Sequence, residues 1–505
     1  MPMKTRGDRT VLWLALGVFL AYLFTSSGGV ESSDAVLRYE TARSWIEGRG
    51  GVLPAQLGWD GGAVLPDGRI YCFFGPLQSV LMVPFILLAR AVPAHGMDTS
   101  VIETFAISLG LLPLVSTAVI VLLFLALRRL GHPPRATLLA CLAIAFASLF
   151  WHYARMGQEE SLVALGFAIW LYGAARLASD GRFPATLMAL GAVVALATRW
   201  ASVPVLAVLC GVTLILLWRF RQRVTLGDVA LGGTLVAITT FLLLLYNYVR
   251  FGDWLQTGYG IWYAHYGLKI LQADGYADHL AALLVSPYRG LLFYSPIVLA
   301  AVAGTFLLRG TERVLGVGAL AALAVATLFF SGFHFWAGGH SWGPRFLTSP
   351  QVLLAPALAT LFARRPRNIL LLPLLALLQF FSVVLPASTE EYVWFNINRS
   401  NPGTCNEWRF ECTPVPQRVP RAVEAVLNTI ANRPGITVKG RPIVAPEVVL
   451  ATSDYRTLYW WPVRIAFRLR RFPSWVAVLV CFAGMGAAAV CLRRAWRAAS
   501  ESSPT

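Results

Sequence analysis

Long apolar stretches separated by short polar turns recur along nearly the whole chain. About twelve of them approach the roughly 20 residues that an α-helix needs to cross a lipid bilayer. They lie near residues 10–26, 104–127, 137–153, 160–177, 185–202, 203–219, 226–246, 291–308, 314–331, 346–363, 369–386 and 474–492. The pattern predicts an all-α integral membrane protein with about 12 transmembrane helices.

One further apolar run, 76–93, decides the topology of everything that follows it. It carries Pro84 and Pro93, and if it crossed the membrane every later loop would change sides. If it does not cross, basic residues gather on one side, as the positive-inside rule expects of cytoplasmic segments. These residues are Lys4, Arg6, Arg9, Arg128, Arg129, Arg135, Arg176, Arg182, Arg219, Arg221, Arg223, Arg309, Arg313, Arg364, Arg365, Arg367, Arg493, Arg494 and Arg497. We therefore predict that 76–93 is an interfacial helix at the outer surface of the cell membrane, with both termini cytoplasmic.

This topology leaves three sizeable outer segments, 27–103, 247–290 and 387–473. The chain then divides into a transmembrane core over 1–386, an extracytoplasmic segment over 387–473, and a last transmembrane helix with its tail over 474–505. The N-terminal apolar run resembles a signal sequence, but no small-residue cleavage site follows it, so we expect an uncleaved first span. In an outer loop, Cys405 and Cys412 are close enough in sequence to form a short disulfide; two free thiols are the alternative.

The composition supports a membrane location and argues against a nucleic-acid partner. Of the 505 residues, 57% are hydrophobic and 13% are charged, whereas soluble globular chains have about 25% charged residues. The formal net charge is +17, which in a soluble protein would suggest nucleic-acid binding. Here the basic residues occur in twos and threes between apolar runs, so the positive-inside rule accounts for them.

The first outer segment begins with an acidic residue beside the membrane. Asp34 follows the first apolar run and opens a stretch in which Ala35, Tyr39, Ala42 and Ile46 recur at helical spacing. A carboxylate at this place could accept a proton from a hydroxyl group that attacks a sugar. The alternative is that Asp34 caps the helix by binding its free N–H groups.

A second acidic site is expected at the next outer turn, which runs from Trp151 to Glu160. Glu159 and Glu160 stand at the start of a predicted helix, close to Arg155. Acidic residues at a helix N-terminus interact favourably with the helix dipole, and this alone could explain them. The functional interpretation is a second acid that faces Asp34 and either orients an acceptor or binds Mg²⁺ or Mn²⁺, although no metal ligand is assigned.

Several outer arginines depart from the positive-inside pattern, and a phosphate group would explain them. Arg199 lies in a short turn, Arg289 ends the second outer segment, and Arg345 ends a turn rich in glycine and tryptophan. Guanidinium groups bind phosphate through paired, charge-assisted hydrogen bonds. In the same turn Trp336, His340 and Trp342 could line a lipid or sugar path. The alternative is an aromatic belt at the interface with arginines that extend to the headgroups.

Together these features resemble the polytopic type C glycosyltransferases, which include protein O-mannosyltransferases and lipid A aminoarabinose transferases. The first span leads to a large outer loop, and an acid opens a juxtamembrane helix. Gly75-Pro76-Leu77 is similar to the family's Pro-Pro-Leu segment, and an arginine-rich inner turn follows. The resemblance covers about residues 10–390. A narrower likeness is to bacterial members of unknown acceptor, through the segments Tyr246 to Gly252, Ser286 to Gly290, and Trp336 to Arg345.

The resemblance implies a catalytic base at Asp34, a second acid at Glu159 or Glu160, and a polyprenyl-phosphate sugar donor. The acceptor would be a lipid, glycan or protein. One departure concerns the donor site, because Phe74 stands where the aminoarabinose transferases have a lysine that meets the phosphate. That role would pass to outer arginines, for which the candidates are Arg69, Arg199, Arg289 and Arg345. The candidate substrate-binding residues are Tyr39, Tyr71, Arg155, Trp336, His340 and Trp342.

Two other functions fit parts of the pattern. A transporter or lipid flippase often has twelve spans, but it should carry ionisable residues near the middle of the membrane. Here the spans are nearly free of charge away from their ends, which disfavours transport. A glycan ligase with a lipid-diphosphate donor would share the outer polar face, so the sequence leaves that alternative open.

Overall fold

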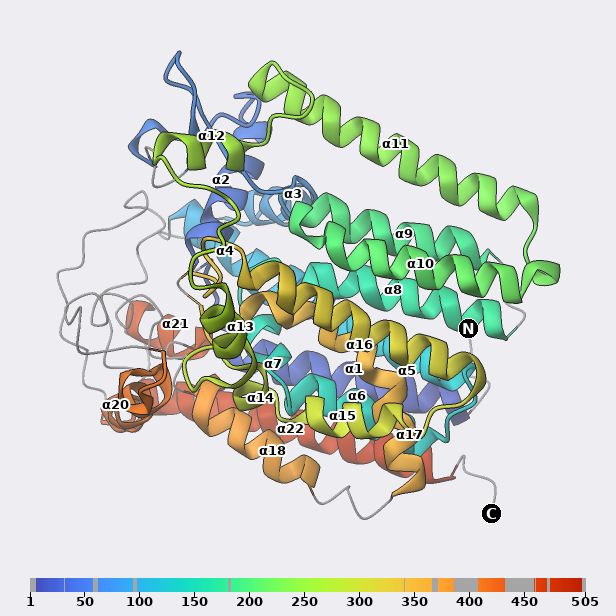
Figure 1. The fold of residues 1–505 in the computed structure, drawn as a ribbon. Coiled ribbons are helices and arrows are strands. Elements are labelled where there is room, and N and C mark those ends of the chain that lie inside the picture. Colours follow the sequence, from blue (N-terminus) through green and yellow to red (C-terminus); the bar gives the residue numbers. More distant parts are fainter. Residues whose placement is uncertain are drawn as a thin grey trace.

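The chain is an all-α integral membrane protein, and its computed structural model describes residues 6–30, 32–57, 62–93, 98–179, 183–339, 341–365, 371–385, 407–431, 458, 460–469 and 473–501. Its long helices lie side by side with roughly parallel axes (Figure 1). A small antiparallel hairpin of β1 (Ala63–Val64) and β2 (Ile70–Tyr71) interrupts the helical pattern. The predicted fold class is therefore confirmed.

Seven helical stretches of the described chain are long and apolar enough to cross a membrane. Four are single helices: α8 (Glu160–Ala178), α11 (Leu226–Phe251), α16 (Gly310–Ser331) and α22 (Ser474–Glu501). The other three are composite: α4 (Thr99–Ala106), π-helical η2 (Ile107–Leu111) and α5 (Leu112–Arg129); η3 (Trp200–Ser202) and α10 (Val203–Arg219); and η5 (Arg345–Leu347), η6 (Ser349–Leu354) and α17 (Ala355–Arg364).

The remaining predicted spans form helices that are broken or whose apolar part is shorter, so the count of about twelve stays a prediction. They comprise α1 (Arg6–Thr25); α6 (Pro134–Phe146) with α7 (Phe150–Ala154); α9 (Pro184–Thr198); α14 (Leu291–Tyr294) with α15 (Ile297–Thr305); and α18 (Leu371–Gln379) with π-helical η8 (Phe380–Val384). The break in 291–308 falls at Pro296, which has no N–H group to continue the preceding helix.

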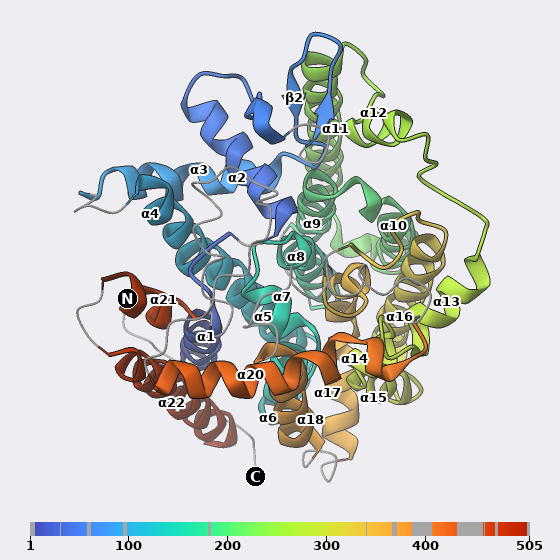
Figure 2. The same ribbon diagram turned by 90° about the vertical axis from the view of Figure 1, so that its left-hand side faces the viewer.

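One end of the bundle carries most of the short elements, and we call it the outer end. Its helices are α2 (Ser33–Ile46), η1 (Ala55–Leu57), α3 (Leu77–Arg90), α12 (Gly258–His265), α13 (Tyr276–Val285), η10 (Phe410–Cys412), α20 (Pro414–Ile430) and α21 (Trp461–Leu469). Seen from this end, α3 and α20 lie lengthwise while α1 and α11 are nearly end-on (Figure 2). The helix α3 therefore crosses the ends of the spans, and its location at the membrane interface stays a prediction.

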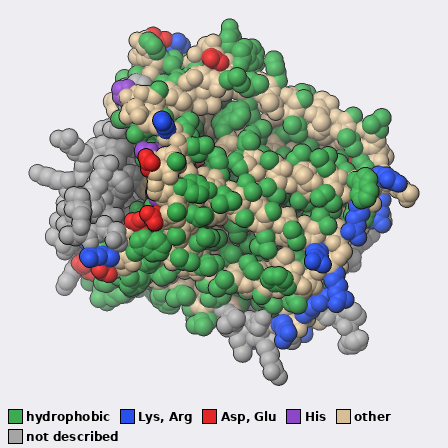
Figure 3. Space-filling view, viewed as in Figure 1, with side chains coloured by type: hydrophobic (Ala, Val, Ile, Leu, Met, Phe, Trp, Pro, Cys, Tyr) green, Lys and Arg blue, Asp and Glu red, His purple; other side chains and the backbone are tan. Residues whose placement is uncertain are grey.

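Charged side chains separate towards the two ends of the molecule (Figure 3). A broad hydrophobic band covers the middle, and most of the visible Lys and Arg residues gather at the end opposite α2 and α12. That end includes η4 (Arg221–Arg223), which joins α10 to α11. Asp, Glu and His side chains show mainly at the outer end. This separation is the one that the positive-inside pattern predicts.

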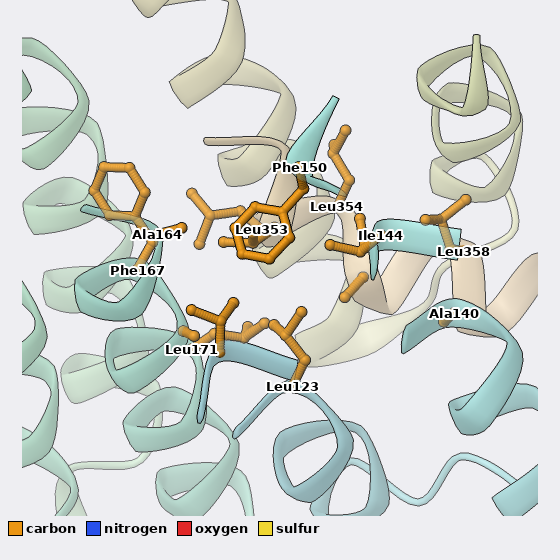
Figure 4. Close-up of a cluster of buried hydrophobic side chains, with 14 of the residues drawn as sticks. Leu123, Ala140, Ile144, Phe150, Ala164, Phe167, Leu171, Leu353, Leu354 and Leu358 are labelled. Atoms are coloured by element: carbon orange, nitrogen blue, oxygen red, sulfur yellow. The ribbon is translucent and has the colours of Figure 1, made fainter. Parts of the chain in front are cut away.

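The centre of the bundle is packed by branched and aromatic side chains from many helices (Figure 4). Leu123 of α5, Ile144 of α6 and Phe167 of α8 meet Leu353 and Leu354 of η6 there. Lipid acyl chains are as apolar as these side chains, so the hydrophobic effect contributes little to the association of helices within a membrane. Close packing must therefore hold the helices together.

The helices α8 and α9 are in close contact, and two glycines make this possible. A Cβ atom added at Gly166 would lie 2.6 Å from the carbonyl oxygen of Gly191, and one added at Gly191 would lie 2.5 Å from the backbone nitrogen of Trp170. The two backbones therefore touch, as small residues allow in membrane helices. This pair positions the start of α8 and the end of α9, where the charged residues described below lie.

We expect Gly191→Leu to separate α8 from α9 and to lower the free energy of unfolding by about 2 kcal/mol, as overpacking of a filled interior does. Unfolding by SDS titration in mixed micelles would measure this loss. Gly233→Leu is the matched control, because a Cβ added at Gly233 on α11 meets no atom within 4 Å. Equal stability of the two variants would contradict the close contact.

Candidate active site

Six charged side chains from four parts of the chain meet at the outer end of the bundle. They are Asp34 and Arg38 from α2, Glu159 and Glu160 from the start of α8, Arg199 from the end of α9, and Arg345 from the start of η5. Carboxylates and guanidinium groups alternate in one continuous series, which we call the ion-pair chain. Its order is Arg38, Glu159, Arg199, Glu160, Arg345, Asp34.

The contacts within the ion-pair chain are short. Arg199 Nε lies 2.5 Å from Glu159 Oε1, and Arg199 Nη2 lies 2.5 Å from Glu160 Oε1. Arg345 Nε lies 2.6 Å from the same Glu160 oxygen, and Arg345 Nη2 lies 2.6 Å from Asp34 Oδ2. Arg38 pairs with the other carboxylate oxygen of Glu159. Each inner member therefore has an opposite charge on both sides.

Burial differs along the ion-pair chain, and the difference singles out one carboxylate. Arg38 and Glu160 are fully buried, and Glu159, Arg199 and Arg345 are nearly so. The Asp34 side chain keeps 21% of its surface exposed. Buried charges are tolerated only when paired, so the inner members stabilise one another. Asp34 is therefore the most exposed carboxylate of the ion-pair chain.

The local structure of α2 explains why the Asp34 side chain can pair with Arg345. Ser32 caps the helix, because its Oγ accepts a hydrogen bond from the backbone N–H of Ala35 at 3.2 Å. The alternative interpretation of Asp34 as the capping residue is therefore not what the structure shows. Asp34 stands in the first turn of α2, and its carboxylate is directed towards η5.

Arg38 is a member of the site that the sequence interpretation missed. It lies one turn after Asp34 on α2, and its Nη1 donates to the Asp34 carbonyl oxygen at 3.1 Å. Its guanidinium carbon lies 3.9 Å above the Phe74 ring, a cation–π contact. Arg38 thus supplies a cation beside Phe74. The spacing of four residues between Asp34 and Arg38 was the available signal.

A cavity of ≈ 220 Å³ opens beside the ion-pair chain. Glu159 and Arg199 contribute its charged part, and the rest of the wall is mostly apolar. Aromatic rings make up much of that wall, from Phe74, Tyr259, Phe329, Phe330, Phe333 and Phe346. A ligand that combines an anionic group with an apolar portion would match such a lining.

Tyr259, the first tyrosine of α12, is a second residue that the sequence interpretation missed. Its ring packs 4.8 Å from that of Phe73. Burial raises the pKa of the Tyr259 phenol, and the nearby Asp34 carboxylate raises it further, against the lowering effect of Arg38 and Arg345. The phenol therefore keeps its proton and remains a hydrogen-bond donor. The outer segment 247–290 gave no motif that singled this tyrosine out.

Three other candidates hold backbone segments and lie outside the ion-pair chain. Arg155 donates to the carbonyl oxygens of Thr25 at 3.0 Å and Val384 at 3.1 Å. Trp342 is buried, and its carbonyl oxygen accepts from the Tyr153 hydroxyl at 2.7 Å. Arg289, the third, donates to carbonyl oxygens of the turn that precedes Arg345.

Tyr39 faces away from the ion-pair chain, towards α3 and α4. Its hydroxyl group donates to Glu103, which also pairs with Arg90 at 2.6 Å. Arg69 and Tyr71 lie in the β1–β2 hairpin, where the guanidinium group binds Asp67 at 2.6 Å and the Tyr71 hydroxyl at 3.2 Å. The Arg69 side chain is 52% exposed.

The remaining predictions concern an aromatic residue, a disulfide and a metal. Trp336 stacks on His279 with ring centroids 4.7 Å apart, whereas His340 lies outside the described residues. Cys412 is disulfide-bonded, and Cys405 lies outside the described residues. Within the described part of the chain, no group of three His, Cys, Asp or Glu side chains is arranged to hold a metal ion. A divalent cation at the three carboxylates would have to replace guanidinium groups.

Two crystal structures of ArnT from Cupriavidus metallidurans, one bound to undecaprenyl phosphate and one in the apo state, share this architecture. Both match with a TM-score of 0.51, at 14% and 13% sequence identity. Each alignment covers 97% of this chain, with 77% and 76% of the ArnT chain. This chain has the ArnT fold. No family model and no curated protein sequence matches it.

The likeness to ArnT confirms, at the level of the fold, the predicted resemblance to type C glycosyltransferases. It covers both the helical bundle and the outer elements, because nearly the whole chain aligns with ArnT. The site that the fold positions here is the ion-pair chain with its adjoining cavity.

We expect Glu160→Gln to destabilise the protein more than Asp34→Asn. Loss of the Glu160 charge leaves Arg199 and Arg345 short of a shared partner in a buried place, which costs about 3 kcal/mol or more. Loss of the Asp34 charge removes one partner at the partly exposed end of the ion-pair chain, for about 1 kcal/mol. SDS titration in mixed micelles would compare the two variants, and equal losses would contradict the observed order of burial.

Proposed function

We propose that the protein is a membrane glycosyltransferase that moves a sugar from a polyprenyl-phosphate donor to an acceptor hydroxyl group. The observation that carries this proposal is the ion-pair chain, which presents buried arginines and one accessible carboxylate beside a cavity. It is supported by the ArnT fold, which in one crystal structure is bound to undecaprenyl phosphate. The three arginines and three carboxylates of the ion-pair chain have a formal net charge of zero, so a bound donor phosphate would give the site a net negative charge.

The donor phosphate is proposed to bind Arg345 and Arg199. A guanidinium group has five N–H donors in a planar fork. Among the described residues, the carboxylates bind Arg345 through Nε and Nη2, which leaves the Nη1 N–H groups for a phosphate oxygen. Arg199 lines the cavity, so its guanidinium group can reach a ligand there. The Tyr259 hydroxyl group is a further donor on the same cavity wall.

The reaction would be a single displacement at the anomeric carbon. The acceptor oxygen forms a bond to this carbon while the bond from the carbon to the phosphate oxygen breaks, and the phosphate leaves with the electron pair. Asp34 takes the proton of the acceptor hydroxyl. The arginines and the Tyr259 phenol stabilise the charge that develops on the phosphate. One displacement inverts the anomeric centre, and the phosphate needs no acid to leave.

Glu159 and Glu160 are proposed to hold the arginines in place. Both are buried between guanidinium groups, so neither is as accessible to an acceptor as Asp34. Glu159 and Glu160 would thus position the arginines, while Asp34 would act as the base. The aromatic part of the cavity would take the apolar portion of the donor next to its phosphate.

The protein is proposed to reside in the inner or plasma membrane with both termini cytoplasmic, so that the outer end faces away from the cytoplasm. The basic end of the bundle supports this orientation. The acceptor would be a lipid, glycan or protein on that side. Transport is less well supported, because the ion-pair chain lies at one end of the bundle and not in its middle. A ligase with a lipid-diphosphate donor would use the same groups.

The test is release of free lipid phosphate from labelled donors. Purified protein in lipid would receive a panel of polyprenyl-phosphate and polyprenyl-diphosphate sugars, with and without EDTA. We expect wild-type protein to release the carrier, and both Asp34→Asn and Arg345→Ala to do so at least a hundredfold more slowly, as the loss of a reacting base or of transition-state charge stabilisation predicts. Chromatography of the labelled lipid would follow the reaction.

Asp253→Asn is the matched control. Asp253 is an exposed residue beyond the end of α11 whose carboxylate accepts from the backbone N–H of Leu255 at 2.8 Å. This variant should keep the wild-type rate. Equal release by wild type and Asp34→Asn would exclude Asp34 as the base. Failure of folded wild-type protein to bind any carrier lipid would exclude the proposed activity. Release only from diphosphate donors would favour the ligase alternative, and loss of release with EDTA would indicate a metal.

A further inference from the structure

Two sequence segments with no assigned role, Ser286 to Gly290 and Trp336 to Arg345, lie against each other, and Arg289 joins them. Arg289 of the first segment is fully buried. Its guanidinium group donates to the carbonyl oxygens of Gly339 at 3.0 Å, Gly343 at 3.4 Å and Ser341. A single cation thus gathers three carbonyl groups of the second segment, which leads directly to Arg345.

The backbone of this turn is shaped to present its carbonyl groups to one point. Gly338, Gly339 and Gly343 have φ values of 75°, 65° and 54°, in the left-handed region where side chains with a Cβ are strained. A Cβ atom added at Gly338 would lie 3.1 Å from Arg345 Cβ. The turn therefore packs against the first part of the Arg345 side chain.

One carbonyl group connects Arg289 to Arg345 directly. The Gly343 oxygen accepts from Arg289 Nη1 and also from the backbone N–H of Arg345 at 3.0 Å. From that anchored backbone, the Arg345 guanidinium group reaches Asp34 and Glu160 at 2.6 Å each. A shift of the turn would move Arg345 relative to both carboxylates.

We propose that Arg289 is a positioning residue, which fixes the glycine-rich turn so that Arg345 is held between Asp34 and Glu160. The proposal rests on the proposed function only in taking Arg345 as a donor-phosphate ligand. Arg289 itself acts through the turn and does not touch the phosphate. A planar fork of donors suits several carbonyl groups at once, which the single ammonium group of lysine matches less well.

Arg250 offers an independent example of the same device and a control for it. Its Nη1 donates to the carbonyl oxygen of Cys72 at 2.6 Å, and its guanidinium carbon lies 3.6 Å from the centre of the Tyr246 ring. Arg250 thereby holds the segment that leads to Phe74, on another side of the site. Removal of Arg250 should leave the turn before Arg345 undisturbed.

The first arm of the test is a double-mutant cycle on the binding of undecaprenyl phosphate. Arg289→Ala and Arg345→Ala should each weaken binding by roughly tenfold to a hundredfold, as the loss of charged hydrogen bonds predicts. The double variant should bind no more than about twofold more weakly than Arg345→Ala, because Arg289 acts through Arg345. Losses that multiply would show that Arg289 contacts the phosphate independently, and would overturn the proposal. Arg289→Lys should recover part of the binding.

The second arm needs no donor lipid. Hydrogen–deuterium exchange should become at least about tenfold faster in the peptide 336–345 of Arg289→Ala, because local opening of that turn no longer breaks the bonds to Arg289. Arg250→Ala should leave exchange in this peptide unchanged. If Arg289→Ala does not fold, Arg289→Lys takes its place, with a smaller increase expected. Unchanged exchange in a folded variant would overturn the proposal. If Arg289→Ala exchanges faster but wild-type protein does not bind undecaprenyl phosphate, Arg289 holds the turn as proposed, and the proposed function is wrong.

Discussion

Burial of a guanidinium group costs several kcal/mol of hydration free energy, and this loss must be offset by carboxylates or carbonyl groups that accept its hydrogen bonds. Three arginines at the outer end, Arg38, Arg199 and Arg345, meet this requirement through carboxylates that they share. Because each shared carboxylate comes from a different helix than its arginines, the pairing also fixes where α2, α8, α9 and η5 stand relative to one another. The same contacts therefore determine the geometry of the site and stabilise the outer end.

Other buried arginines satisfy the same requirement through backbone carbonyl groups. Arg155, Arg250 and Arg289 each donate to carbonyl oxygens of a distant segment. The two kinds of arginine differ in what they offer a ligand. An arginine that is paired with carboxylates can exchange one carboxylate oxygen for a phosphate oxygen. An arginine that binds carbonyl groups cannot do so without disturbing the backbone that it holds. The arginines that pair with carboxylates are therefore the candidates for binding a ligand, and those that bind carbonyl groups support the backbone.

The sequence predicted the helical bundle well because hydropathy reports directly on lipid contact. It also indicated Asp34, Glu159, Glu160, Arg199 and Arg345, since charged residues beside apolar spans stand out. It placed the second acid opposite Asp34, but it did not indicate that Arg199 and Arg345 pair with these carboxylates, because that pairing depends on the packing of α2 onto α8 and η5, which no local pattern records. For the same reason Arg289 and Arg345 looked alike in sequence, although one binds carbonyl groups and the other binds carboxylates.

The backbone contact between α8 and α9 has a consequence for precision. Glu160 and Arg199 stand at adjoining ends of these two helices, only a few turns from the glycines that let the helices touch. Helices in backbone contact have no side chains between them that could reorient and absorb a displacement. Reactive groups must be held within about half an ångström of their working positions. The two glycines, which have no functional side chain, therefore limit how far Glu160 and Arg199 can move relative to each other.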